Sequence, residues 1–260
     1  MRIRAAVLRE IGRPGPYAES RPLSIEDIEL DPPGAGEVLV RIRAAGLCHS
    51  DLSVIDGNRP RPMPMVLGHE AAGVVESVGP GVTRLAAGDH VVAAFVPSCG
   101  HCGPCDAGRP ALCEPGFAAN SAGTLLSGSR RLHDADREVN HHLGVSGFAD
   151  HAVLAANSLV RVRADLPFAE AALFGCAVIT GVGAVVNTAA MPRGASVAVV
   201  GLGGVGLAAL LAARMLEAEH IVAIDMNDAK LATAREFGAT ATVNAADSDA
   251  AEKVRELTHG

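Results

Sequence analysis

The stretch from residue 196 to residue 238 constrains the fold of this chain more than any other. A β-branched run, SVAVV at 196–200, leads through a glycine-rich turn into a helix-compatible run, LAALLAARML at 207–216. A second strand-like run, HIVAID at 220–225, is followed by a second helical run at 228–238. Strands and helices that alternate in this order predict an α/β fold with a doubly wound parallel sheet.

The glycine-rich turn is also a candidate binding site, because Gly201-Leu-Gly-Gly-Val-Gly206 matches the pattern G-x-G-x-x-G. Such glycines let the backbone approach a pyrophosphate, whose charge is met by the free N–H groups at the start of the next helix. The bland alternative is a turn that only packs a helix against a strand. The residues expected to bind the dinucleotide are Gly201, Gly203, Gly204, Val205 and Gly206.

Asp225 lies nineteen residues after Gly206, at the end of the next predicted strand. An acidic side chain at this place accepts hydrogen bonds from an adenosine ribose. A carboxylate there also repels a 2'-phosphate, and the next two residues supply no Arg to receive one. The sequence therefore favours NAD over NADP.

The first part of the chain, residues 1–162, has a different texture. Short Val-rich runs at 38–46, 71–79 and 89–96 are separated by Gly and Pro, which predicts strands of a compact β-rich domain. Gly88-Asp89 is expected to turn one strand into the next. From residue 163 onward, Ala-rich helical segments alternate with single strands, so we expect a second domain over 163–260.

Four cysteines follow one another at short spacing in Cys99-x2-Cys102-x2-Cys105-x7-Cys113. Four thiolates so close in sequence can close a tetrahedral zinc site that contributes folding energy and has no open position. An iron–sulfur cluster is the rival interpretation, although in the ferredoxin pattern the fourth Cys follows after three residues and precedes Pro, whereas here it precedes Glu114. A zinc-ribbon nucleic-acid module is the third, and the formal net charge of -7 argues against it.

Three further candidate ligands are scattered along the chain. Cys48, His69 and Cys176 together could supply the Cys2His set of an open catalytic zinc site. Singly, each has a duller explanation as a buried thiol or a surface His. Spacing alone does not show that they meet.

Several motifs in order add what spacing cannot supply. GLCHSD at 46–51, GHEAAGVVESVG at 68–79, the four-cysteine loop, FGCAVITGVGAVV at 174–186 and VVGLGGVG at 199–206 closely resemble the zinc-dependent alcohol dehydrogenases of the medium-chain dehydrogenase/reductase family. The resemblance implies a β-rich GroES-like catalytic domain at 1–162, followed by an incomplete Rossmann NAD-binding domain at 163–260. It also implies two zinc ions per chain, with Cys99, Cys102, Cys105 and Cys113 holding the structural one.

The resemblance assigns the catalytic zinc to Cys48, His69 and Cys176, with Glu70 as an alternative or transient ligand. Asp51 would orient the His69 ring. Ser50 resembles the hydroxyl that accepts the substrate's proton, although Ser50 and Asp51 could instead merely cap a turn.

Four more residues take family roles by position. His49 resembles a cationic contact to the cofactor's pyrophosphate, and Thr180 a residue that packs near the nicotinamide. Lys230 resembles a contact to the adenosine ribose beside Asp225, and Phe95 would line the substrate pocket.

The chain also departs from the family pattern. Ser53 stands where the best-known members carry the histidine that ends the proton relay, so the last step of that relay is open. The chain ends at Gly260 after about two strand–helix units, from which we expect a fragment of a longer product or a truncated chain. Residues 118–145 are expected to form a long polar loop similar to that of dimeric relatives, with His141 and His142 solvated on it.

The composition of the chain argues against nucleic acids and membranes as partners. No basic residues cluster, so a nucleic-acid surface is not expected. The N-terminus lacks the apolar core of a signal peptide, which indicates a cytoplasmic protein. The uncharged stretches 171–192 and 194–213 are long enough to cross a bilayer, but glycines break both, as in buried elements of an α/β domain. We expect no membrane partner.

The expected function is hydride transfer between an alcohol, a primary one by our interpretation, and NAD, giving the aldehyde or ketone. The substrate partner is thus a small alcohol or aldehyde, and a homodimer is expected. Glutathione-dependent formaldehyde oxidation is the alternative within the enzyme class. From another class comes a non-catalytic zinc-binding fragment, and an iron–sulfur electron carrier is third.

Overall fold

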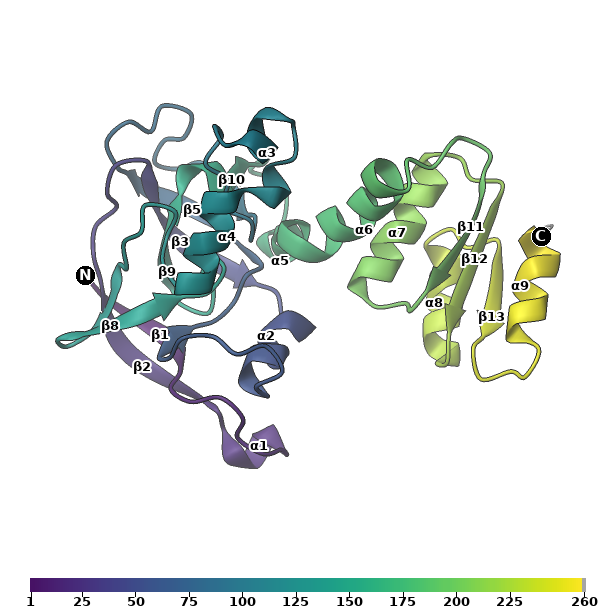
Figure 1. The fold of residues 1–260 in the computed structure, drawn as a ribbon, viewed down its shortest axis with the longest axis horizontal. Coiled ribbons are helices and arrows are strands. Elements are labelled where there is room, and N and C mark those ends of the chain that lie inside the picture. Colours follow the sequence, from purple (N-terminus) through teal and green to yellow (C-terminus); the bar gives the residue numbers. More distant parts are fainter. Residues whose placement is uncertain (259–260) are drawn as a thin grey trace. The chain divides into compact units, whose positions relative to one another are not determined.

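The computed structural model describes residues 1–258. The chain separates into two compact units, Met1–Cys176 and Ala177–Gly260 (Figure 1). The sequence suggests a boundary after residue 162, whereas the contacts divide after Cys176. The reason is that Ala171 and Ala172 pack into a core with Ala72 and Val92 of the first unit.

The first unit is built mainly of strands. They are β1 (Arg2–Leu8), β2 (Leu23–Leu30), β3 (Glu37–Ala45), β4 (Met65–Val66), β5 (Ala71–Val78), β6 (His90–Ala93), β7 (Leu132–Asp134), β8 (Arg137–His141), β9 (His151–Ala155) and β10 (Leu159–Arg161). Its helices are α1 (Tyr17–Ser20), α2 (His49–Ile55), α3 (Gly103–Asp106), α4 (Glu114–Ala122) and α5 (Phe168–Leu173), with 3-10 turns η1 (Pro110–Leu112) and η2 (Ala156–Ser158) and a π-helical turn η3 (Phe174–Val178).

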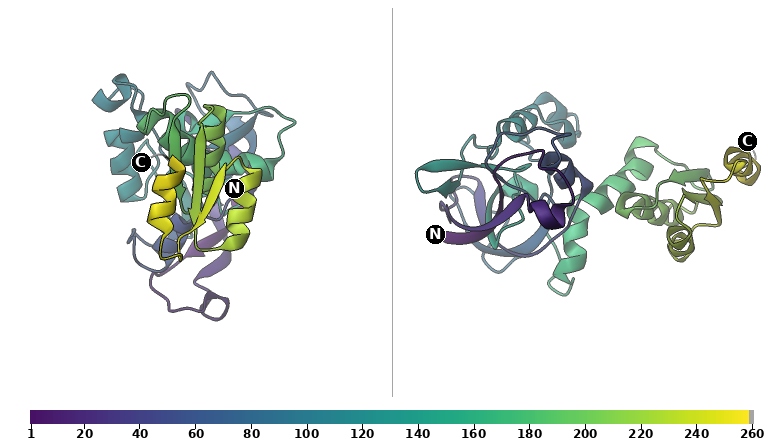
Figure 2. Two further views of the ribbon diagram at one scale, coloured as in Figure 1. Left: turned by 90° about the vertical axis from the view of Figure 1, so that its right-hand side faces the viewer. Right: turned by 90° about the horizontal axis from the view of Figure 1, so that it is seen from below.

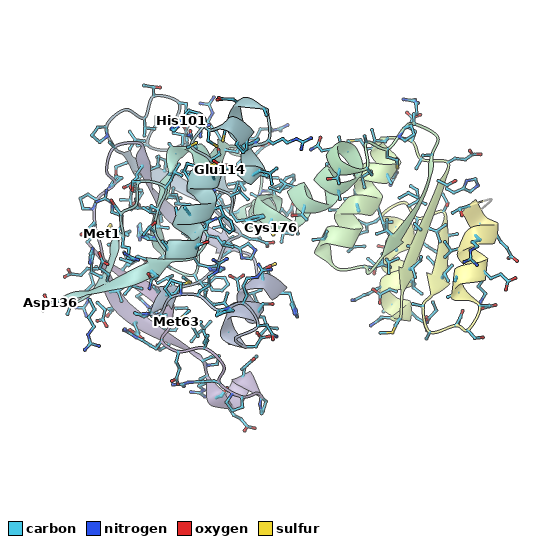
Figure 3. The ribbon with its side chains drawn as sticks, in the orientation of Figure 1. Met1, Met63, His101, Glu114, Asp136 and Cys176 are labelled. Carbon is cyan, nitrogen blue, oxygen red and sulfur yellow. The ribbon has the colours of Figure 1, made fainter. Side chains whose placement is uncertain are left out.

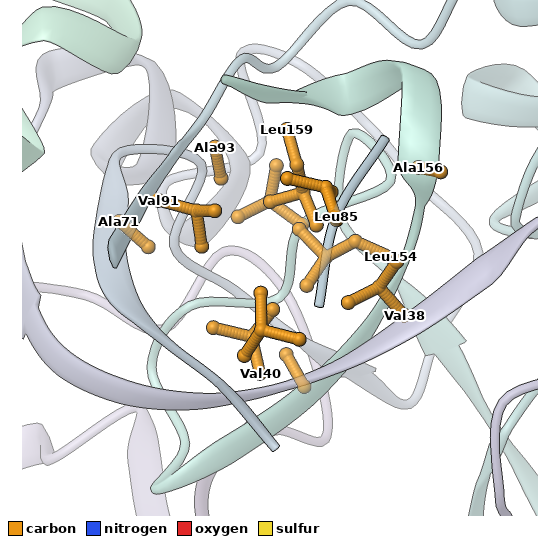
Figure 4. Close-up of a cluster of buried hydrophobic side chains, with 12 residues drawn as sticks. Val38, Val40, Ala71, Leu85, Val91, Ala93, Leu154, Ala156 and Leu159 are labelled. Atoms are coloured by element: carbon orange, nitrogen blue, oxygen red, sulfur yellow. The ribbon is translucent and has the colours of Figure 1, made fainter. Parts of the chain in front are cut away.

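These strands form a closed barrel in the order β1-β2-β7-β8-β4 and a five-stranded sheet in the order β10-β6-β5-β3-β9. The sheet buries one face of alternating strand residues, seen in Figure 4 around Val40, Leu85 and Leu154. The barrel has its own core around Ile28, Leu30 and Leu132. The strands predicted at 38–46, 71–79 and 89–96 are confirmed as β3, β5 and β6, and Gly88 turns with a φ of +92°.

The segment 118–145 is not the polar loop that the sequence suggested. It contains the end of α4 and the hairpin of β7 and β8, which completes the barrel. The hairpin pairs Leu132 with Val139, and both side chains are buried in the barrel core together with Leu125. A few apolar residues at alternating positions are enough to fix this hairpin, although the surrounding residues are mostly polar.

The second unit confirms the predicted strand–helix order. It contains α6 (Ile179–Gly183), a π-helical turn η4 (Ala184–Thr188), β11 (Ser196–Val200), α7 (Gly204–Met215), β12 (His220–Asp225), α8 (Asp228–Glu236), β13 (Ala241–Asn244) and α9 (Ala250–Thr258).

The three strands of this unit are parallel, in the order β11-β12-β13. Helices α7 and α8 pack through Leu210 and Leu231 on one face of the sheet, and α9 packs through Val254 and Leu257 on the other (Figure 2). The sheet is therefore covered on both faces, as expected for a doubly wound fold.

One continuous helical run, Phe168–Thr188, is apolar and long enough to cross a membrane by length and composition alone. A single run of this kind is weak support for a membrane protein, since core helices of soluble proteins pass the same test. In this chain the run contains the two π-helical turns η3 and η4, which are common at functional sites.

Candidate active site and metal centres

Four predicted residues come together in the first unit. The ligand atoms of Cys48, His69, Glu70 and Cys176 all lie within 4.8 Å of one another. Cys48 precedes α2, His69 and Glu70 lie between β4 and β5, and Cys176 belongs to η3, where Figure 3 labels it. Residues separated by more than a hundred positions thus converge on one point.

A close approach of η3 to the sheet brings Cys176 to this point. A Cβ atom on Gly175 would lie 2.3 Å from the carbonyl oxygen of Ala93 in β6, so only glycine allows the contact. The backbone N–H of Gly46 donates to the carbonyl oxygen of Glu70 at 2.9 Å, which ties the loop that carries Cys48 to the start of β5. The glycines close to Cys48 and Cys176 in the sequence therefore allow the close backbone contacts that bring the ligands together.

The cluster is rich in acidic groups and almost dry. His69 is 1% exposed, Glu70 3% and Cys176 9%. Burial raises the pKa of the Cys176 thiol to about 12, and the nearby Cys48 and Glu70 add to the effect. Two thiols and a carboxylate in so small a volume repel one another when ionised, and a divalent cation relieves that repulsion. Two Cys and one His are the donors of a catalytic zinc site, so the residues present fit this metal.

Asp51 lies behind His69. Its Oδ2 atom is 3.0 Å from His69 Nδ1, and its Oδ1 atom is 3.3 Å from Nε2 of a residue not predicted for the site, His142. Oδ1 also accepts a hydrogen bond from the backbone N–H of Gly68 at 3.0 Å. Burial alone would raise the pKa of Asp51, but the contacts with His142 and His69 outweigh it and hold that pKa well below its usual range.

The expectation that His141 and His142 are solvated is wrong. Each is 1% exposed. His141 is the last residue of β8, a strand of the closed barrel, and His142 follows it directly. The apolar residues around the pair, Val139, Leu143 and Val145, were the available signal. His141 Nε2 accepts a hydrogen bond from the backbone N–H of Arg131 at 3.0 Å, and its Nδ1 lies 3.5 Å from the Ser146 hydroxyl.

The four cysteines of the loop also meet. The sulfur atoms of Cys99, Cys102, Cys105 and Cys113 lie within 4.8 Å of one another. Figure 3 labels His101 and Glu114, which lie within and just after this loop.

Backbone N–H groups already point at these sulfurs. Cys113 Sγ accepts from the N–H groups of Cys99 at 3.2 Å and Gly116 at 3.3 Å. Burial raises the pKa of Cys105 to about 11, whereas a backbone hydrogen bond from Cys105 lowers that of Cys102 to about 7. Four sulfurs with such donors fit a closed tetrahedral metal site.

A cavity of about 390 Å³ lies beside Phe95, between the His69 ring that Phe95 contacts and Cys113 of the four-cysteine loop. Phe95 belongs to its lining and also packs edge-on against the His69 ring, with 5.6 Å between ring centroids. The other lining residues are Val96, Ala111, Leu112, Cys113, Glu114, Phe117, Asn120 and Leu143. The cavity is thus mainly apolar, with one carboxylate in its lining. Next to this lining, Arg61 Nη1 donates a hydrogen bond to the backbone carbonyl oxygen of Asn120 at 3.2 Å.

The remaining predicted residues of the first unit lie at the start of α2. His49 is exposed and Ser50 is half-buried. The Ser53 hydroxyl donates to the backbone carbonyl of His49 at 3.0 Å, so the residue that replaces the expected histidine is used within the helix.

In the second unit, the glycine turn connects β11 to α7. Gly201 has a φ of +89°, and a Cβ atom on Gly206 would lie 1.9 Å from the Gly201 carbonyl oxygen. Asp225 is held against this turn, because its Oδ2 accepts from the N–H of Leu202 at 2.8 Å. This hydrogen bond, and a second from the N–H of Asn227 to Oδ1 at 3.0 Å, lower the pKa of Asp225.

Two other predicted cofactor contacts belong to the same unit. Lys230 Nζ lies 3.7 Å from Asp225 Oδ2, beside the end of β12. Thr180 is exposed on α6. Lys230 and Asp225 thus lie side by side, and their contact with a ribose stays a prediction.

Comparisons with known proteins agree with this arrangement. Residues 34–164 match the family model of the alcohol dehydrogenase GroES-like domain, and residues 204–260 match that of the zinc-binding dehydrogenases. The chain is 41% identical over 250 residues to an S-(hydroxymethyl)glutathione dehydrogenase of Synechocystis sp., covering 96% of this chain and 66% of that protein.

Two solved structures are similar over the whole chain. An alcohol dehydrogenase zinc-binding domain protein from Burkholderia ambifaria is 42% identical, with a TM-score of 0.93. A benzyl alcohol dehydrogenase from Acinetobacter calcoaceticus is 36% identical, with a TM-score of 0.90. Each match covers 100% of this chain and 68% of the other. The chain therefore spans about two thirds of the length of these proteins.

Proposed function

The chain belongs to the zinc-dependent alcohol dehydrogenases of the medium-chain dehydrogenase/reductase family, and from this we propose that the whole protein transfers hydride between an alcohol and NAD. The observation that carries the proposal is the convergence of Cys48, His69 and Cys176, with Glu70, in one buried cluster. The family's model is named for zinc, and one solved structure similar to this chain is an NAD-dependent alcohol dehydrogenase, so zinc and NAD are the proposed cofactors. In this chain Cys48, His69 and Cys176 would hold the catalytic zinc, and Cys99, Cys102, Cys105 and Cys113 the structural one.

When bound, zinc supplies Lewis acidity that lowers the pKa of an alcohol oxygen, and NAD supplies the acceptor for hydride. The protein's own residues would bind the metal, orient its ligands and accept the proton of the substrate. Asp51 fixes His69 through Nδ1, which leaves Nε2 as the nitrogen with a lone pair to offer a metal. Glu70 is close enough to exchange with another ligand of the set.

Ser50 is the proposed proton acceptor for the substrate hydroxyl. It is half-buried on the first turn of α2, two residues after Cys48, and therefore links a dry site to water. Because the Ser53 hydroxyl donates to the His49 carbonyl, we propose that the proton passes from Ser50 to water and not to Ser53.

NAD is the proposed dinucleotide, held at the turn from Gly201 to Gly206. The free N–H groups at the start of α7 suit a pyrophosphate, and the ionised Asp225 suits an unphosphorylated ribose. His49, Thr180, Val205 and Lys230 stay proposed contacts to the cofactor.

The substrate is proposed to be an uncharged alcohol with an apolar tail, a primary one, oxidised to its aldehyde. The cavity beside His69 is lined by Phe95, Leu112, Phe117 and Leu143. Its lining carboxylate, Glu114, repels an anionic substrate. The second candidate is S-(hydroxymethyl)glutathione, which the 41% identical relative favours.

One assay separates the two candidates. The purified protein is tested with benzyl alcohol and NAD, and with formaldehyde and NAD, each with and without glutathione. We expect oxidation of benzyl alcohol that is independent of glutathione and is lost in Cys176→Ser. Formaldehyde oxidation that requires glutathione would support the second candidate. A folded chain that binds zinc but oxidises neither would support the non-catalytic fragment.

The chain is a soluble protein by its family, and we propose the cytoplasm as its compartment. We also propose a homodimer. This rests on the family resemblance of the 118–145 region, which forms a barrel hairpin in this chain. Light scattering of the purified protein tests it, with twice the chain mass as the expected result.

A further inference from the structure

The Asp51 carboxylate lies between two buried imidazoles, one of which is not a member of the zinc set. We propose that His142 is a positioning residue for the catalytic metal: it holds Asp51 in place, and Asp51 in turn holds His69. The inference rests on the proposed function, because it takes the cluster of Cys48, His69 and Cys176 to bind zinc.

The three side chains form one dry contact chain. His69 and His142 are each 1% exposed and Asp51 is 3% exposed. The imidazole rings of His69 and His142 pack edge-on, with 5.8 Å between centroids and 76° between planes. These three packed side chains therefore have little room to rearrange if one of them is replaced.

Protonation follows from the arrangement. Each oxygen of Asp51 faces one imidazole nitrogen, His69 Nδ1 at 3.0 Å and His142 Nε2 at 3.3 Å. Because carboxylate oxygens accept hydrogen bonds, this geometry calls for Nδ1–H on His69 and Nε2–H on His142. Within residues 1–258, neither ring nitrogen of His142 makes a hydrogen bond of good geometry, and the polar atom that Nε2 approaches is Asp51 Oδ1, at 3.3 Å. The contact with Asp51 is therefore the interaction that this buried ring offers.

The backbone around His142 supports this role. Its N–H donates to the Ser146 hydroxyl at 3.0 Å across a tight turn in which Leu143 and Gly144 have φ values of 51° and 69°. This turn holds the backbone of His142 directly after β8, a strand of the closed barrel. A donor held in place suits a positioning role, because groups behind a metal ligand set its orientation and basicity.

Asp51 depends on this donor. Oδ1 receives the backbone N–H of Gly68 and the His142 contact, whereas Oδ2 faces His69 alone among the described residues. When His142 is removed, the carboxylate loses one of its two side-chain partners in a dry site and is free to rotate away from His69. Loss of such a group behind a metal ligand costs roughly 10- to 100-fold in metal affinity.

The test uses three variants of the full chain. His142→Phe keeps the ring but removes the donor, and His142→Gln restores an N–H donor. His141→Phe is the matched control, because His141 is equally buried next door but its ring contacts the Arg131 backbone N–H at 3.0 Å and the Ser146 hydroxyl at 3.5 Å, and not Asp51. It therefore also tests whether the effect of His142 comes only through the Ser146 turn. Zinc affinity of both sites is measured by competition with a chromophoric chelator, and the site geometry by the d–d spectrum of the cobalt-substituted protein.

We expect His142→Phe to weaken the catalytic zinc by roughly 10- to 100-fold and to shift the cobalt d–d bands. The four-cysteine site should keep its affinity. His142→Gln should recover most of the loss, and His141→Phe should lower the melting temperature without moving either readout.

Three results would overturn the inference. The first is an unchanged affinity and spectrum in His142→Phe, and the second is an equal loss in His141→Phe. The third is a further zinc ion that His142→Phe abolishes and Cys176→Ser does not, which would make Asp51, His69 and His142 a metal site of their own. A wild-type chain that binds only the four-cysteine zinc would instead contradict the proposed function.

A measurement on the unmodified protein covers the case in which His142→Phe does not fold. Long-range proton–nitrogen NMR spectra of the zinc-loaded protein report the tautomer of each histidine. His142 should carry its proton on Nε2. A proton on Nδ1 would contradict the inference, since Nε2 could then not donate to Asp51.

Discussion

Asp225 combines two tasks in one side chain. Both of its oxygens already accept backbone N–H groups, from Leu202 at 2.8 Å and from Asn227 at 3.0 Å. Its charge is therefore concentrated at the end of β12, where the cofactor's ribose is proposed to bind. Asp225 therefore holds the glycine turn in place and is also proposed to favour NAD over NADP.

Asp225→Asn should weaken NAD binding by roughly 10- to 100-fold, because hydrogen bonds to a charged group contribute about 1.5–3 kcal/mol. Binding of NADP should be affected less, since the repulsion of its 2'-phosphate is removed. Calorimetric titration with both dinucleotides measures this. An equal loss for NAD and NADP would show that Asp225 only holds the turn.

His141 should make the stability of the protein depend on pH. Burial lowers its pKa to about 3, and the charges of Arg130 and Arg131 act in the same direction. The unfolded chain has a His pKa near 6.5. Between these two values only the unfolded state binds the proton, so stability falls as pH drops below about 6.5, by up to about 1.4 kcal/mol per pH unit.

His141→Gln removes this contribution. Urea unfolding at pH 7 and pH 5 should show a steeper loss of stability in the wild type than in the variant. Parallel loss in both proteins would mean that His141 does not cause the dependence.

At the residue scale, the chemistry of the site could be predicted from the sequence better than its geometry. The donor types of Cys48, His69 and Cys176 suggested a Cys2His set, and only the family resemblance brought them together. His142 was missed because the apolar neighbours Val139, Leu143 and Val145 signal burial of the pair but not a contact with Asp51. Its role depends on the fold of β8 against α2, which no local pattern encodes.

The glycine turn is the element on which the second unit depends most. Gly206→Ala should destabilise the protein by about 1–3 kcal/mol, because the new Cβ would lie 1.9 Å from the Gly201 carbonyl oxygen. Gly203→Ala is the matched control for stability, since a Cβ there meets nothing within 4 Å. Chemical denaturation compares the two variants.

The control has a second use. If a pyrophosphate approaches the backbone at Gly203, then Gly203→Ala should weaken NAD binding at nearly unchanged stability. Full NAD affinity in this variant would argue that the turn serves packing only.

Among the elements, those with a strong period could be predicted. The runs that became β3, β5, β11, α7 and β12 are long enough, and regular enough, to be recognised by sequence. The hairpin of β7 and β8 was not, because its strands are only three and five residues long and carry few apolar side chains. Its position depends on pairing with β2 and β4, which are distant in sequence.

For the molecule as a whole, the four-cysteine site is proposed to be part of the fold. Cys113 is buried, and the loop from Cys99 to Cys113 has little regular structure beyond short helical turns. Metal binding must then supply order that packing does not.

Removal of zinc by a strong chelator should therefore lower the melting temperature. If the structural site contributes even about 2 kcal/mol, the drop is roughly 4–8 °C for a chain of this size. Cys113→Ser should melt at the lower temperature already and respond little to the chelator. Calorimetry checks both, and an unchanged melting temperature after confirmed zinc removal would show that the loop folds without its metal.

This chain is proposed to build two separate zinc sites, one of them catalytic. The most direct test is the metal content per chain by elemental mass spectrometry, for the wild type, Cys176→Ser and Cys113→Ser. We predict two zinc ions in the wild type, and in Cys176→Ser a single one that the four-cysteine loop retains. A wild type with one zinc that survives in Cys176→Ser, or one with iron and sulfide in place of zinc, would contradict the claim.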